Sequence, residues 1–286
     1  MKFKTIKVLT IAAVVLGAVA CKEKSNPVVI EETNSTTMYT MNTTSYWING
    51  SYKYDSTNAK SAYTSYDSTY ITQKTTYQGK DAYNTIKMQG SQDGKFTTPI
   101  LSYYSSFNDN EYLMSGAFLK SILDYIPEVL VSQLNLNLPI DKWYTIANNK
   151  KDTSALLENS IEVTDVSVPN LENVKLDLSF NIYSIRMGNT TETDPVNQKS
   201  IKGVKFDLNS RITVKVKIDG ISIDLPLPKS FINLHTYLTF GEGIGLMKMD
   251  TPTQDVKFSV DYLIAKYDIY KFMVQGRGFE LLRYKN

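Results

Sequence analysis

Cysteine and histidine are almost absent from this sequence, which has one residue of each among 286. A single cysteine cannot close an intramolecular disulfide, and it excludes zinc sites built from clustered cysteines. A single histidine excludes metal sites that need a histidine pair, and it leaves His235 as the one histidine that could act as a general base. The stability of the fold must therefore come from the burial of apolar side chains.

Long hydrophobic runs are missing after Ala20, so nothing beyond this point is expected to span a membrane. The one apolar run, residues 8–20, follows three lysines and is shorter than the ~20 residues of a membrane-spanning helix. Ala18 and Ala20 are the small residues expected before a cleavage point, and Cys21 follows them. We therefore expect residues 1–20 to be a signal peptide.

Cys21 would begin the mature chain, and a thiol at this position is the group that bacterial lipoproteins use for diacylglyceryl transfer. The segment resembles a lipobox, although Ala18 stands where most lipoboxes carry a larger aliphatic residue. The alternative is ordinary signal-peptidase cleavage beside an incidental cysteine. Lys22, Glu23 and Lys24 resemble in part the surface-export signal of Bacteroidota lipoproteins. The resemblance implies a lipid anchor at Cys21 in the bacterial outer membrane, with the domain either periplasmic or surface-exposed.

The charge of the mature chain is nearly balanced. Loss of Lys2, Lys4 and Lys7 lowers the number of Lys and Arg from 31 to 28, against 29 Asp and Glu, so the net charge changes from +2 to −1. Nucleic-acid binding needs a clustered basic surface, so this balance argues against a nucleic-acid partner.

The mature chain divides into a tether and a domain. Residues 21–40 are polar and aperiodic after the cysteine, which is typical of a flexible tether. Residues 41–286 are expected to form a single antiparallel β-rich domain. Between residues 45 and 114, segments rich in Tyr and Thr alternate with short turn signals, which predicts a meander. The turn signals are Asn49-Gly50, Gln78-Gly79, Asp93-Gly94 and Asn108-Asp109-Asn110.

Helices are expected only near the middle of the domain. Apolar residues at helical spacing predict a helical insertion near residues 117–134, kinked or divided at Pro127. Asp152 and Thr153 could cap a short helix that ends at Glu158.

The second half alternates apolar and polar residues, which predicts strands with one buried face. These strands fall at residues 174–182, 204–208, 212–218, 221–225, 232–240 and 256–262. Residues 187–200 are polar and are expected to form a long loop.

The fold class expected is mainly β, with a large antiparallel sheet, half-barrel or sandwich-like, and one or two covering helices. This order of elements is similar to the half-barrels of LolA-like lipoprotein carriers. Residues 237–249, which contain the glycine-rich run 241–248, resemble a strand-turn-strand found in uncharacterised Bacteroidota lipoproteins, a family that implies no known activity.

No local motif predicts catalysis or a cofactor. The glycines at 241, 243 and 245 favour a hairpin over a phosphate-binding loop, because no helix is expected after them. His235 falls on the solvent-facing side of its strand, and Asp109 and Glu111 lie in a turn without EF-hand spacing. Asp55-Ser56-Thr57 and Asp67-Ser68-Thr69 resemble the O-glycosylation acceptors of Bacteroidota.

Two functional hypotheses lead, both non-enzymatic; an enzyme comes third, because local motifs assemble no nucleophile–base or paired-carboxylate constellation and only a long-range carboxylate pair would supply one. The first is a non-catalytic binding role for a lipid or other hydrophobic ligand, held on the apolar concave face of the sheet. The alternative is a surface adhesion or envelope-assembly module that binds glycan or protein through its Tyr-rich strands, to which Trp47, Trp143 and the 20 tyrosines could contribute. No metal or cofactor is implied, and the membrane is contacted through the N-terminal lipid anchor.

Overall fold

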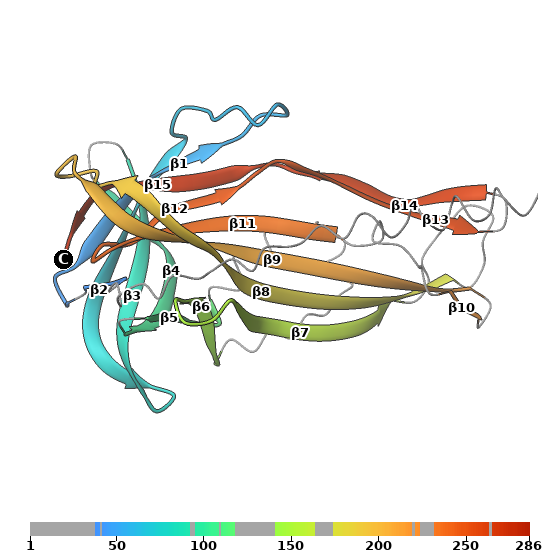
Figure 1. The fold of residues 1–286 in the computed structure, drawn as a ribbon, viewed down its shortest axis with the longest axis horizontal. Helices are drawn as coiled ribbons and strands as arrows, with labels where there is room; N and C mark the ends of the chain where they lie inside the picture. The colour runs from blue at the N-terminus through green and yellow to red at the C-terminus, as the bar shows by residue number, and fades with distance from the viewer. Residues whose placement is uncertain are drawn as a thin grey trace, which may run out of the picture. The chain divides into compact units, whose positions relative to one another are not determined.

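The fold of this protein is almost entirely β-structure wherever it is described. The computed structural model describes residues 38–40, 42–91, 95–108, 110–117, 141–163, 174–218, 221–223, 232–262 and 265–286. All of them belong to one compact unit, Ser35–Asn286. Within these ranges no helix is both long enough and apolar enough to cross a membrane. Figure 1 shows the described chain as long, curved strands.

The first six strands form a meander in which each strand is hydrogen-bonded to the next. Gln78 and Gly79 join the second strand to the third with φ angles of 47° and 72°, and such left-handed turns match the twist of a hairpin. The meander expected over residues 45–114 is therefore confirmed. Its strands are β1 (Tyr46–Lys53), β2 (Ser65–Tyr77), β3 (Lys80–Gly90), β4 (Phe96–Phe107), β5 (Glu111–Ser115) and β6 (Trp143–Asn148).

The later strands extend the same sheet from the other side of β1. The order across the sheet is β6-β5-β4-β3-β2-β1-β15-β12-β11-β9-β8-β7, all antiparallel, and β10 pairs with β9. β13 and β14 form a two-stranded sheet of their own. The strands are β7 (Thr153–Val163), β8 (Val174–Thr193), β9 (Ser200–Ile218), β10 (Ile221–Ile223), β11 (Ile232–Gly241), β12 (Gly245–Thr251), β13 (Gln254–Tyr262), β14 (Ala265–Val274) and β15 (Arg277–Lys285).

The two ends of the sheet, β6 and β7, approach each other. The buried hydroxyl of Ser184 in β8 donates a hydrogen bond of 2.6 Å to the carbonyl oxygen of Ile146 in β6. Ile146, Leu156 in β7 and Ile182 in β8 also share one core. The sheet is thus nearly closed and barrel-like. The expected mainly β class with a large antiparallel sheet is confirmed, and a curved, barrel-like form is favoured over a sandwich. The helical insertion expected near residues 117–134 lies outside the described residues after Ala117.

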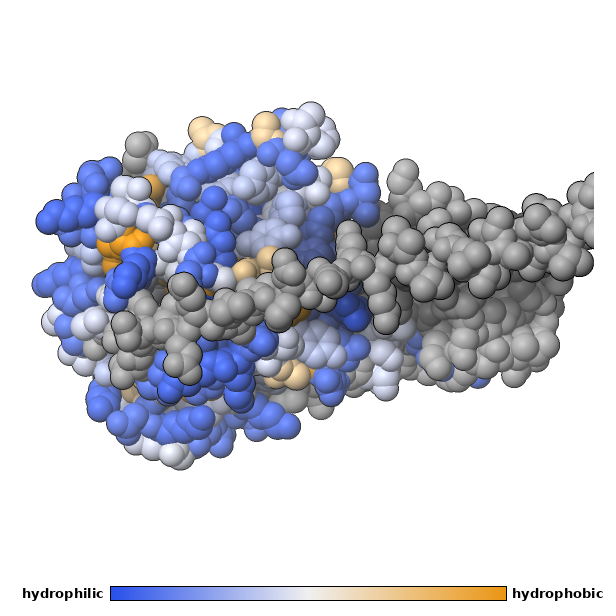
Figure 2. Space-filling view, viewed as in Figure 1, coloured by the Kyte–Doolittle hydropathy of each residue, from blue (hydrophilic) through white to orange (hydrophobic). Residues whose placement is uncertain are grey.

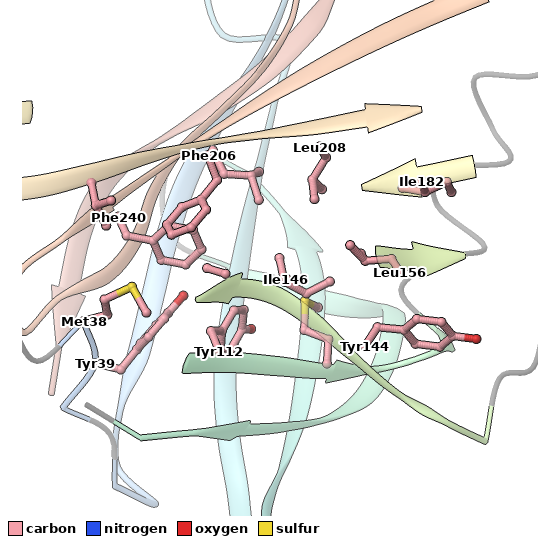
Figure 3. Close-up of a cluster of buried hydrophobic side chains, with 14 of the residues drawn as sticks. Met38, Tyr39, Tyr112, Tyr144, Ile146, Leu156, Ile182, Phe206, Leu208 and Phe240 are labelled. Atoms are coloured by element: carbon pink, nitrogen blue, oxygen red, sulfur yellow. The ribbon is translucent and has the colours of Figure 1, made fainter. Parts of the chain in front are cut away.

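The core occupies the inside of the curved sheet. Side chains from seven strands and from Met38 and Tyr39 meet there, as Figure 3 shows for ten labelled residues. Phe206 and Phe240 from neighbouring strands are almost fully buried and lie edge to face, 5.7 Å apart. The cluster consists of Met38, Tyr39, Tyr103, Tyr112, Met114, Tyr144, Ile146, Ala147, Leu156, Ile182, Val204, Phe206, Leu208, Leu238 and Phe240.

The prediction of a long loop at residues 187–200 is wrong. β8 continues to Thr193 and β9 begins at Ser200, so that only six residues connect them. The carboxylate of Asp194 accepts hydrogen bonds from the backbone amides of Val196 and Asn197 and closes the turn. Polar residues such as Thr190 still favour strands, and their polarity reflects exposure rather than a loop.

Two other local expectations are also wrong. Asn49-Gly50 is not a turn, because both residues lie within β1. Gly50 is needed for a close approach, since a Cβ atom there would lie 2.8 Å from the ring of Tyr63. The short helix expected from Asp152 to Glu158 is replaced by β7, whose ladder with β8 overrides the local capping signal.

The Phe240→Ala variant tests the aromatic core. Phe240 has no exposed surface, so its removal leaves a cavity that should destabilise the fold by about 3–5 kcal/mol. Urea unfolding followed by tyrosine and tryptophan fluorescence would measure the loss. Ile100→Ala is the matched control, because Ile100 is 48% exposed and its truncation should change stability by less than about 0.5 kcal/mol. Equal effects of the two changes would contradict this account of the core.

Candidate functional site

Tyr39 lies at the centre of the aromatic cluster inside the sheet (Figure 3). Its ring centroid lies 4.7 Å from that of Tyr112 and 5.8 Å from that of Phe240, and Trp47 meets it edge-on at 6.5 Å. Its hydroxyl accepts a hydrogen bond of 2.7 Å from the backbone amide of Leu246. Burial raises the pKa of Tyr39 well above its ordinary value, so the hydroxyl stays neutral. This part of the interior is thus packed with aromatic rings.

The glycine-rich turn between β11 and β12 leaves space for the ring of Tyr39. Gly245 has a φ of 100°, and a Cβ atom there would lie 1.8 Å from the Tyr39 ring. Strand β12 follows the turn directly, and no helix N-terminus is formed. The expected strand-turn-strand is confirmed, and the glycines permit a close approach rather than a phosphate site.

Beyond the aromatic cluster, polar side chains from the first strands also face inward. Directly opposed residues of neighbouring strands lie on the same face of a sheet. Asn49 lies opposite Asp67 in β2 and opposite Leu281 in β15, which is buried in an apolar cluster with Trp47. The register therefore carries Asn49 and Asp67 into the interior. We call Asn49, Ser51, Asp67 and Lys87 the interior polar group.

The carboxylate of Asp67 is the centre of the interior polar group. It accepts hydrogen bonds from Asn49 Nδ2 at 3.0 Å and from Ser51 Oγ at 3.3 Å, and Lys87 Nζ lies 3.2 Å from its second oxygen. The Asp67 side chain is 6% exposed, whereas that of Lys87 is 25% exposed. The ion pair is thus buried at its acidic end and reaches water at its basic end.

Apolar groups border the ammonium of Lys87. Its Nζ lies 5.3 Å from the ring centroid of Phe279, a cation–π contact, and Leu101 lies opposite Lys87 in the ladder between β3 and β4. Asn49 Oδ1 is buried and has no hydrogen-bond partner among the described residues. The arrangement offers one charged donor and one unused acceptor beside an apolar wall, which suits a molecule with a polar end and an apolar body.

His235 lies on the outer face of the sheet, as its strand pattern predicts. Its Nδ1 lies 2.8 Å from Asp207 Oδ2, and because a carboxylate can only accept, this nitrogen donates the hydrogen bond. Its ring is parallel to that of Tyr237, with centroids 6.0 Å apart and an angle of 12° between the planes. Within the described ranges, no group of three or more His, Cys, Asp and Glu side chains could hold a metal ion.

The other candidate residues have structural partners. Trp47 is buried and donates from Nε1 to the carbonyl of Ile244 at 2.8 Å, so it belongs to the core. Trp143 donates to the carbonyl of Tyr77 at 3.1 Å. Glu111 accepts hydrogen bonds from Thr145 and Asn148, while Asp109 lies outside the described residues. Cys21 also lies outside them, so its lipidation stays a prediction.

The two Asp-Ser-Thr segments differ in accessibility. In the turn after β1, Asp55 is exposed and accepts hydrogen bonds from Thr57 and Ala59. In β2, Asp67 and Ser68 are both buried, so this second segment is not available to a modifying enzyme in the folded protein.

Asp67 and Lys87 were not recognised as a pair from the sequence. Lys87 alternates correctly with Thr85 on one face of β3, but charged residues on a strand usually indicate a solvated face. The one local signal is that Lys87 lies two residues after the buried Thr85 and so shares its face of β3. That spacing indicates a pair with Asp67 only once β2 and β3 are placed in register.

Comparison with known proteins gives two structural similarities. No family model matches the chain, and no curated protein matches it. A crystal structure of a candidate lipoprotein from Parabacteroides distasonis is 12% identical with a TM-score of 0.44, over 88% of this chain and 100% of that one. A candidate exported protein with a YmcC-like fold from Bacteroides fragilis is 11% identical with a TM-score of 0.34, over 87% and 98%.

The Lys87→Met variant tests the buried ion pair. Its loss leaves the Asp67 carboxylate without its cation, and breaking such a pair typically costs about 3–5 kcal/mol. We expect a loss near the lower end, because Lys87 is partly exposed. Lys74→Met is the matched control, since the Lys74–Asp81 pair is exposed and should contribute less than about 1 kcal/mol. Urea unfolding of both variants would measure the difference.

A double variant separates the pair from the lysine itself. In Lys87→Met with Asp67→Asn the uncompensated charge is gone, so part of the lost stability should return. A double variant no more stable than Lys87→Met alone would show that the two side chains are not coupled.

Proposed function

We propose that this chain is a lipid-anchored protein of the bacterial outer membrane that binds an amphiphilic, largely hydrophobic ligand inside its sheet and catalyses no reaction. The observation that carries the proposal is Lys87, which lies on the inward face and keeps 25% of its side chain exposed. A lysine on an inward face that still reaches water marks an opening into the interior at this level of the sheet.

The wall beside Lys87 supports an apolar ligand. Leu101 lies opposite it, Phe279 lies under its ammonium, and Met249 lies opposite Phe279 in β12. Leu101 and Met249 are only partly buried and pack against the aromatic core. An acyl chain entering here would cover apolar surface that water now reaches, which is favourable by about 25 cal/mol for each Å² buried.

The interior polar group supports a polar end on that ligand. Asp67 orients Lys87, whose ammonium retains donors that Asp67 does not use. Asn49 Oδ1 can accept a hydrogen bond that no described residue donates. A head group with both an acceptor and a hydroxyl would match these two groups, as in a hydroxylated or carboxylated lipid.

Binding rather than catalysis is supported by the chemistry of the same group. The hydroxyl of Ser51 faces the carboxylate of Asp67 and not a histidine. That carboxylate accepts hydrogen bonds from Asn49 and Ser51 and pairs with Lys87, so no arrangement of nucleophile, base and orienting group is formed by these four residues.

A lipid anchor at Cys21 is tested with Cys21→Ser. Serine cannot form the thioether to diacylglycerol, so the variant should lose incorporation of labelled palmitate in bacterial cells and leave the membrane fraction. Lipid-linked chains with two or more acyl groups stay bound, whereas a chain without them does not. Equal palmitate labelling of the parent and the variant would exclude Cys21 as the anchor.

Interior ligand binding is tested by native mass spectrometry of the Cys21→Ser chain, purified gently from bacteria. We expect adducts of lipid mass that disappear on denaturation. Lys87→Gln should lower the bound fraction several-fold because it removes the charged donor, and Lys74→Gln should leave it unchanged. A bare protein mass, under conditions that preserve lipid on a known carrier, would overturn the proposal.

A further inference from the structure

The outer face of the sheet carries a second polar and aromatic surface, on the side opposite the interior polar group. Strand register places Tyr237 directly opposite Asp207 in β9 and Asp250 in β12. In the same row, Asp250 lies opposite Gly278 in β15, and Gly278 lies opposite Tyr52 in β1. We call this surface the outer strip; it consists of Tyr52, Tyr54, Lys60, Tyr63, Asp207, His235, Tyr237, Lys248, Asp250 and Glu280.

Each acid of the outer strip is paired with a base. Asp207 lies 2.8 Å from His235, Lys248 lies 2.8 Å from Asp250, and Lys60 pairs with Glu280. Because acids and bases alternate, the strip presents no block of one charge. A nucleic acid or a strongly charged protein segment would find no complementary patch here.

Hydrogen bonds hold these side chains in place. Tyr52 and Tyr54 both donate to Asp250, and Tyr63 donates to Glu280 at 2.7 Å. Burial alone would raise the pKa of Asp250, but the hydrogen bonds from Lys248 and the two tyrosines outweigh it and lower that pKa. The carboxylates are thus fixed and ionised, and they would lose little conformational entropy on binding.

Tyr237 provides an exposed aromatic surface beside these fixed acceptors. It is 37% exposed, and its ring is parallel to that of His235. The Asp207 side chain is only 7% exposed and its unpaired Oδ1 is buried, so the acids that a ligand can reach are Asp250 and Glu280, whose side chains are 19% and 30% exposed. Partly exposed acceptors beside an aromatic face match a ligand that has both hydroxyl groups and apolar C–H faces.

We propose that the outer strip binds a neutral glycan. Tyr237 stacks on the C–H face of one sugar ring, and the partly exposed carboxylates of Asp250 and Glu280 accept hydrogen bonds from hydroxyls of the glycan. Four strand spacings separate β9 from β1, which is about 19 Å at the usual interstrand distance. The ligand is therefore an oligosaccharide or a segment of polysaccharide rather than a single sugar.

The visible surface agrees with a polar ligand. Figure 2 shows that the described part of one face is mostly hydrophilic, with only small, separate apolar spots. Neutral glycans need polar acceptors with single aromatic rings rather than a continuous apolar patch, and the outer strip offers the exposed ring of Tyr237 among charged side chains.

The test is affinity electrophoresis of the full chain in native gels that contain glycogen, mannan or laminarin, with dextran sulfate as an anionic control. We expect at least one neutral polysaccharide to retard the protein, and dextran sulfate to retard it less. Tyr237→Ala should weaken the retarding interaction about three- to ten-fold, and Tyr237→Phe should retain it because the ring remains.

Tyr104→Ala is the matched control, since Tyr104 belongs to another stacked pair, with Tyr77, on β4 outside the strip. It should leave glycan binding unchanged. Retardation by none of the neutral polysaccharides, or equal loss in Tyr237→Ala and Tyr104→Ala, would overturn the proposal. Stronger retardation by dextran sulfate would overturn it as well, because it would show binding through charge. Lipid adducts at the interior are measured separately, so either proposal can fail alone.

Discussion

The alternation of side chains along a β-strand is the constraint on which this molecule depends. Successive residues point to opposite faces of the sheet, and the sheet curves until β6 and β7 nearly meet. Each strand therefore has one face toward the interior and one face toward the outside. Phe206 and Leu208 of β9 pack into the aromatic core, while Asp207 between them meets His235 outside. A shift of one residue in register would exchange these sets, burying the charges and exposing the aromatic rings. Both candidate surfaces thus follow from the same ladder of hydrogen bonds.

Tyrosine and glycine act together in this ladder. Three glycines within strands or at their ends lie beneath tyrosine rings: Gly50 under Tyr63, Gly245 under Tyr39, and Gly278 beside the hydroxyl of Tyr52. Each lets an aromatic side chain lie flat on the sheet where a Cβ atom would collide with it. The first and third support the outer strip, and the second supports the core. The many tyrosines of the chain therefore have two uses, which composition alone does not separate.

Much of the fold could be predicted from the sequence, because strand alternation is a local signal. The meander from β1 to β5 and the hairpin of β11 and β12 follow from turn residues and from apolar spacing. The errors arise where tertiary pairing overrides a local signal. Asp152 and Thr153 resemble a helix cap, yet Thr153 begins strand β7, which pairs with β8, and the polar Thr190 lies within β8 opposite Gly203. The Asp67–Lys87 pair and the neighbours of Tyr237 depend on register between strands, which no local pattern contains.

The pairing of β1 with β15 has a consequence for how the chain acquires this structure. These strands are the first and last along the chain, and they lie side by side in the middle of the sheet. Strand β12 and the strands beyond it are joined to the meander by the ladder through β15. The continuous ladder of strands cannot join the two halves until the final residues are available, and sheets dominated by such distant contacts fold slowly. A chain that emerges from its N-terminus onward would first form the meander with an unpaired edge at β1. Unpaired edges attract other chains, so during synthesis and transport β1 is the strand that most needs protection from aggregation.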